Sequence, residues 1–123
     1  NNEDKAKAAY TKVLSIATGA LAAEALYYDA YFKNKAQDYE GSNVSVQKLA
    51  KDFSAYKEWG GKGLIIMAKN FDALGDAYQA TYILDSVIAN FAQYPEVVTE
   101  AKAEAFRIKS KEAQSNSSVN PEN

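Results

Sequence analysis

The sequence predicts an all-α protein of antiparallel helical hairpins, stacked as a right-handed superhelix of about six helices. Three observations carry this prediction. The 123 residues include only two prolines, and runs of alternating β-branched residues are nearly absent. Apolar residues recur at steps of three and four, as they do on one face of an amphipathic helix. The chain also partly matches itself after a shift of 38 residues, a repeat length typical of helical solenoids.

The first three predicted helices occupy the N-terminal half of the chain. An apolar pattern over residues 3–17 predicts the first helix, and we expect it to end before Gly19, because glycine is common at helix ends. A second helix is predicted over about 20–36 and is interrupted at 37–41. A third starts near Ser42 and gives way to a looser link at 54–58.

Three further helices are predicted in the C-terminal half. One carries apolar residues from Leu64 to Leu74 and stops at Gly75, and another spans about 77–91. Pro95 opens the last, because proline at a first helical position loses no needed hydrogen bond. Residues 113–123 have almost nothing to bury, so we expect a disordered tail. The prediction is one helical domain over 1–112, with repeats at about 20–57 and 58–95 and one flanking helix on each side.

The repeat is the most informative feature of the sequence. Six identities could arise by chance in an alanine-rich chain, but helix interruptions and small residues keep the same register. Small residues are expected where paired helices pack closely, because the gap admits little more than a β-carbon. The identical pairs are Leu26/Leu64, Ala30/Ala68, Asp38/Asp76, Phe53/Phe91, Tyr56/Tyr94 and Glu58/Glu96.

The composition argues against several classes of function. Without histidine or cysteine, the chain lacks acyl-transfer triads, thiol catalysis and the commonest general base and metal ligand. The formal net charge of −2 gives no overall attraction to nucleic acid or anionic membranes. No apolar run approaches the ~20 residues of a membrane helix. We therefore predict a non-enzymatic protein without cofactor, metal, nucleic-acid partner or membrane insertion. The chain begins with Asn1, and we expect it to be a fragment or a processed form.

Two local motifs are interpreted as structural. The glycines at 60–63 flank Lys62, but a phosphate-binding loop needs Gly-Lys-Ser/Thr after a strand, so we expect a flexible helix entry. Glu96, Glu100 and Glu104 form an acidic row without the loop carbonyls of a calcium site, so a solvated face is expected.

The run from Ala68 to Ala80 resembles the tetratricopeptide pattern. It has a small residue, an aromatic residue three positions later, a Leu-Gly-Asp turn and an alanine that opens the second helix. The run at 22–28 is similar to repeats of bacterial cell-envelope tetratricopeptide proteins, of the outer-membrane-assembly lipoprotein and Tol–Pal coordinator types. The resemblance covers about 20–95. The first repeat departs from the pattern at Asp29, Lys33 and Ser42, and the period of 38 exceeds the usual 34.

The resemblance implies a scaffold or adaptor that binds a peptide or protein in a concave groove lined by the first helix of each pair. It also favours a periplasmic or outer-membrane-associated location as part of a larger protein, although a cytoplasmic one stays open. Tyr27 and Tyr31 either line this groove or pack on the preceding helix. The alternative function is self-association through the end helices. Carried onto this chain, the groove positions are Glu24, Tyr27, Tyr31, Asn34, Lys35, Lys62, Ile65, Lys69 and Asp72.

Overall fold

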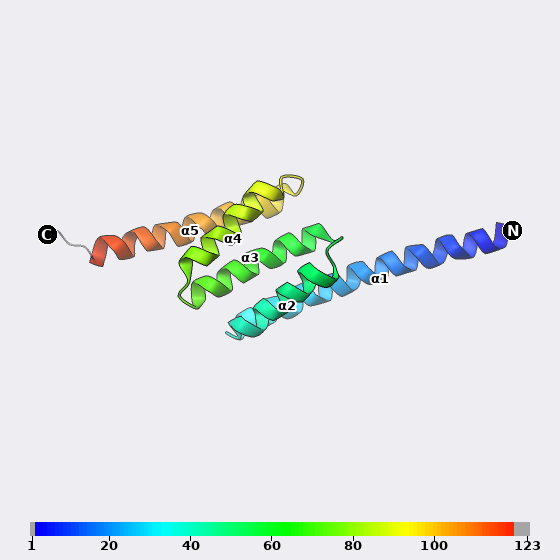
Figure 1. Ribbon diagram of the computed structural model, residues 1–123, viewed down its shortest axis with the longest axis horizontal. Helices are drawn as coiled ribbons and strands as arrows, with labels where there is room; N and C mark the ends of the chain where they lie inside the picture. The colour runs from blue at the N-terminus through cyan, green and yellow to red at the C-terminus, as the bar shows by residue number, and fades with distance from the viewer. Residues whose placement is uncertain (1, 120–123) are drawn as a thin grey trace.

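The computed structural model describes residues 2–119, and of residues 10, 13–17 and 117–119 it describes the backbone alone. This part of the chain is all-α, as predicted, and has five helices where about six were expected (Figure 1). The helices are α1 (Asn2–Lys35), α2 (Tyr39–Asp52), α3 (Lys57–Ala73), α4 (Ala77–Asn90) and α5 (Pro95–Val119).

The number differs because the expected end before Gly19 is wrong. Residues 3–17 and 20–35 belong to one continuous helix, α1. Gly19 serves a close approach instead, since a β-carbon there would collide with the hydroxyl group of Tyr56. The side chain of Tyr56 therefore packs directly against the backbone of α1 at this position.

The expected tail is also partly wrong, because α5 continues to Val119 and residues 113–119 are helical. The side chains of residues 111–116 are exposed, which agrees with a segment that has little to bury. The remainder of the expected tail, residues 120–123, lies outside the described residues.

The helices pack sequentially as adjacent pairs. Each contacts the next one along the chain, and α3 also contacts both α1 and α5. The helices α1, α3 and α5 therefore form one layer with α3 in the middle, while α2 packs against α1 and α3, and α4 packs against α3 and α5.

The shift of 38 residues relates the turns of the two hairpins. Gln37 and Gly75 both have positive φ, at 66° and 91°. The next residues, Asp38 and Asp76, are N-caps whose side chains each accept a backbone N–H three residues later at 3.0 Å. The later helix ends repeat as well, with Phe53 at the C-cap of α2 and Phe91 at that of α4. Turns and helix caps therefore recur at the spacing of 38 residues.

The core lies between the layer of α1, α3 and α5 and the helices α2 and α4 that pack against it, and it runs through the molecule. Small residues allow close helix contact, and Ala30 and Ala68 are fully buried as expected from the repeat. The glycines expected to form a flexible entry lie inside α3 instead. The largest fully buried apolar side chains are Leu49, Ile65, Leu84, Ile108, Val46, Val87 and Val97.

In the part of the chain that the structure describes, no helix is long and apolar enough to cross a membrane.

Candidate functional site

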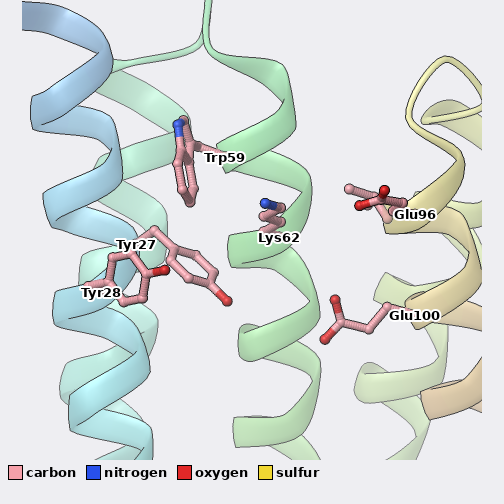
Figure 2. A pocket seen from close by; sticks show the side chains of 7 residues that line it. Tyr27, Tyr28, Trp59, Lys62, Glu96 and Glu100 are labelled. Atoms are coloured by element: carbon pink, nitrogen blue, oxygen red, sulfur yellow. The ribbon is translucent and has the colours of Figure 1, made fainter.

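A pocket opens on the layer of α1, α3 and α5, and Figure 2 shows the side chains that surround it. Its volume is about 280 Å³. One wall comes from consecutive residues of α1, the floor from the first turns of α3, and the opposite wall from the first turns of α5. The lining residues are Tyr27, Tyr28, Trp59, Lys62, Glu96, Val97 and Glu100.

Aromatic rings form the wall on the side of α1. The rings of Tyr27 and Tyr28 lie 5.3 and 6.2 Å from that of Trp59, between centroids. Tyr31 and Phe32 extend this cluster along α1, with centroids 5.4 Å apart and nearly perpendicular planes. Such tilted and edge-to-face pairs favour a fixed arrangement of the rings.

Charged groups complete the site. The ammonium group of Lys62 lies 4.7 Å from the centre of the Trp59 ring, a cation–π distance. Across the pocket, Glu96 and Glu100 project from α5 toward α3 (Figure 2). Deeper along the same face, Lys69 and Glu100 approach to 3.8 Å. The face therefore combines flat apolar area with charges of both signs.

The phenol group of Tyr27 stays protonated at neutral pH. Its burial, and then the negative charge of Glu100, raise the pKa of Tyr27 above its ordinary value of 10.0. Its hydroxyl group can therefore both donate and accept a hydrogen bond at the mouth of the pocket.

Several predicted groove residues do lie together on this layer. Tyr27 and Lys62 line the pocket. Tyr31 belongs to the adjoining aromatic cluster, and the ammonium group of Lys35 lies 5.2 Å from the centre of its ring. Lys69 pairs with Glu100. Glu24 is half-buried on α1, one turn before Tyr27.

Three predicted groove residues are either buried in the core or bonded to other residues of the chain. Ile65 is only 1% exposed and belongs to the core, so its assignment to an open groove is wrong. Asn34 does not hold its amide free for a peptide, because its Nδ2 donates to Oδ1 of Asn70 at 2.8 Å.

The third residue, Asp72, is engaged by α5. Arg107 and Lys111 contact its carboxylate at 2.9 and 2.8 Å. Burial alone would raise the pKa of Asp72, but the hydrogen bonds from Lys111 and Arg107 outweigh it and hold the pKa below its usual range. This carboxylate therefore ties α3 to α5.

The sequence prediction omitted Tyr28, Trp59, Glu96 and Glu100. Tyr28 follows Tyr27 directly on α1 and is 42% exposed. The repeat could have identified Glu100, which stands 38 residues after Lys62 and therefore occupies the equivalent position on α5. The sequence prediction placed groove residues only on the helices that correspond to α1 and α3.

Within the described residues, no group of three or more acidic side chains is placed to hold a metal ion. Comparison with protein-family models, with curated proteins and with solved structures gives no match.

Proposed function

We propose that the layer of α1, α3 and α5 binds a segment of another protein, and that this chain acts as a non-enzymatic scaffold or adaptor. The observation that supports this most is the pocket, where partly exposed aromatic rings and charged groups from three helices converge. Aromatic side chains with polar tips are enriched at protein interfaces, where they contribute much of the binding free energy.

The tetratricopeptide resemblance supports the same choice of face. In that family the first helix of each hairpin lines a concave groove, and here these helices are α1, α3 and α5. We propose that the hairpins continue this arrangement as a right-handed superhelix. The resemblance also supports the proposal that the chain belongs to a larger envelope-associated protein.

The chemistry of the pocket suggests how a partner segment binds. An apolar or aromatic side chain fits against Tyr27, Tyr28 and Trp59, which bury flat area with little loss of side-chain freedom. Polar groups of the same segment lie along Glu96 and Lys62. Because charges of both signs line the site, binding depends on the order of charges in the partner and not on its net charge.

A peptide-display selection followed by titration tests this proposal. Trp59 is the only tryptophan in the chain, so its fluorescence reports directly on the pocket. We expect a selected peptide to change this fluorescence and to perturb backbone amide resonances in α1, α3 and α5. Tyr27→Ala should weaken binding by at least tenfold, as truncation of a buried aromatic anchor does. Lys69→Ala should act mainly on the association rate and its salt dependence.

The matched control is Tyr82→Ala, because Tyr82 is a 63% exposed tyrosine on α4. It should leave the affinity unchanged, and circular dichroism should show that both variants are folded. Equal losses from Tyr27→Ala and Tyr82→Ala would contradict the assignment. Selected peptides that perturb only α2 and α4 would contradict it as well.

A further inference from the structure

The pocket on the layer of α1, α3 and α5 offers two kinds of group that bind cations. Aromatic rings, among them those of Tyr27 and Trp59, form the wall on the side of α1. Glu96 and Glu100 lie opposite, one helical turn apart on α5. The face of an aromatic ring attracts a cation through its electron density, and a carboxylate attracts it through its charge. A positive group that enters between the two walls therefore gains from both.

The chain already holds a cation against the aromatic wall. The ammonium group of Lys62 lies 4.7 Å from the centre of the Trp59 ring, and Figure 2 shows it between the rings and the two carboxylates. In the part of the chain that the structure describes, Lys62 forms no ion pair with Glu96 or Glu100. Its single ammonium group contacts the ring but not an acid as well. The position over Trp59 therefore accepts positive charge and is occupied here by a flexible side chain.

The carboxylates remain available to a partner. Two carboxylates and one ammonium group line the pocket, which leaves the lining negative overall. Glu100 also approaches Lys69, but only to 3.8 Å. Glu96 is exposed and forms no ion pair among the described residues. After burial, the charge of Glu100 is the next cause that raises the pKa of Tyr27, so the negative field reaches the aromatic wall.

The size and shape of the pocket favour one planar cationic group. Its volume of about 280 Å³ lies just below the roughly 300–1,000 Å³ of pockets that enclose drug-sized ligands, so it suits a single large side chain. A guanidinium group is flat, stacks on aromatic rings and presents several N–H donors in a fixed fork. It can therefore cover a ring and donate to a carboxylate at once, which the ammonium group of Lys62 does not do.

We propose that the pocket binds an arginine side chain of the partner segment, which stacks on the aromatic wall and donates to Glu96. This inference rests on the proposed function and names the group that enters the same site. The aliphatic stem of the arginine supplies the apolar contact with Tyr27 and Trp59. Lys62 leaves the ring when the arginine enters, because two positive groups on one ring face repel each other. In the order of charges along the partner, a positive charge therefore stands at the pocket.

A set of short peptides tests the choice of group. Each has five residues and blocked ends, with glycine and serine around a central arginine, lysine or citrulline, and citrulline has the shape of arginine without its charge. Each peptide is titrated while the fluorescence of Trp59, the only tryptophan, is followed. We expect the arginine peptide to bind about tenfold more tightly than the citrulline peptide, because a hydrogen bond between charged groups is lost in the latter. The lysine peptide should fall between the two, and the differences should shrink at high salt.

The Lys62 side chain reports directly on the entry of the arginine. Its ammonium group lies over the Trp59 ring, so the ring shields the protons of the neighbouring methylene group. The arginine peptide should move these proton resonances toward the position of an unshielded lysine, and the citrulline peptide should not. If the pocket were only a structural aromatic cluster, no peptide would displace Lys62.

Three variants separate binding from folding. Lys62→Met removes the resident cation and keeps a flexible apolar stem, so it should tighten binding of the arginine peptide about fivefold. Glu96→Gln should weaken this binding about tenfold. The matched control is Glu40→Gln, because Glu40 is an exposed acid in the first turn of α2, as Glu96 is in the first turn of α5. It should leave the affinity unchanged, and circular dichroism should show that all three variants are folded.

Equal affinity for the arginine peptide and either of the others would overturn the inference. Weaker binding by Lys62→Met, or equal losses from Glu96→Gln and Glu40→Gln, would overturn it too. A display-selected peptide that enters the pocket through an apolar, aromatic or acidic residue would overturn it as well, while the proposed function would stand. Failure of every peptide to perturb α1, α3 and α5 would overturn both.

Discussion

At the scale of single residues, Asn70 is the polar centre of the fold. Its side chain is fully buried, and its Oδ1 accepts from Asn34 of α1. Its Nδ2 donates to Oγ of Ser42 and to Oδ1 of Asn43, both at 2.8 Å, and Ser42 in turn donates to the carbonyl oxygen of Ala30 at 2.7 Å. One amide group therefore joins α1, α2 and α3, and its burial is compensated because its partners are in place.

Asn70→Ala should lower the free energy of unfolding by about 1–3 kcal/mol, since it removes the acceptor of Asn34 and a donor to Ser42 and Asn43 inside the core. Urea denaturation measures the change. Asn90→Ala is the control, because Asn90 is exposed and bonds only within α4 to Ser86 among the interactions described. It should change stability by less than about 0.5 kcal/mol. Similar values for the two variants would show that the network contributes little.

The sequence predicted some site residues correctly and misplaced others, because the position of a residue on its helix decides whether it faces the surface or the core. Tyr27 and Lys62 were found because the helical pattern and the family resemblance place them on the first helices. Ile65 was misplaced because neighbouring positions on a helix differ by about 100°, so a small error of register separates surface from core. The partners of Asp72 and Asn34 come from other helices, 35 or more residues away in sequence. No local pattern carries that information.

At the scale of elements, the starts of α4 and α5 were predicted correctly, but α2 was expected to start near Ser42 and begins at Tyr39. The N-caps Asp38 and Asp76 mark the starts of α2 and α4, and Pro95 marks the start of α5. The mistaken end at Gly19 has a physical reason, because glycine is also used where another group approaches the backbone closely. Here that group is the Tyr56 side chain, and the sequence does not distinguish the two uses.

The adjacent glycines of α3 provide a test of this distinction. A β-carbon at Gly60 would meet nothing within 4 Å, so Gly60→Ala should stabilise the helix by roughly 0.5–1 kcal/mol. A β-carbon at Gly61 would lie 2.9 Å from the ring of Phe91 and 3.1 Å from Val97. Gly61→Ala should therefore destabilise the protein by about 1–3 kcal/mol, through overpacking. Thermal and urea unfolding measure both variants. Stabilisation by Gly61→Ala would show that Phe91 moves aside at little cost.

At the scale of the whole molecule, the sequence predicted the all-α class, the repeat period and the pairing of neighbours. These follow from local periodicity and from short connections between helices. The exposed faces could not be predicted from the sequence, because they depend on which helices lie beside one another. The pocket combines residues of α1, α3 and α5 that are far apart in the sequence.

The core is continuous from Ala30 to Ile108, which predicts that the hairpins unfold together. Leu84 is fully buried in α4, and Leu84→Ala should cost about 2–5 kcal/mol by leaving a cavity. Trp59 lies on α3 and contacts Tyr27 of α1, so its fluorescence follows the packing between the two hairpins. Far-UV circular dichroism and this fluorescence should therefore shift to the same lower midpoint, as a two-state transition requires.

Tyr82→Ala is the control for this experiment, because Tyr82 is exposed on the same helix and should leave both midpoints nearly unchanged. All variants are compared at one protein concentration, since self-association would stabilise the folded chain. If Leu84→Ala lowered the midpoint seen by circular dichroism but not that of Trp59, α4 would unfold separately from the contact between α1 and α3. Stability would then be a sum of nearest-neighbour terms, as in long repeat arrays. A common shift would instead show that α3, which contacts all four other helices, couples them into one cooperative unit.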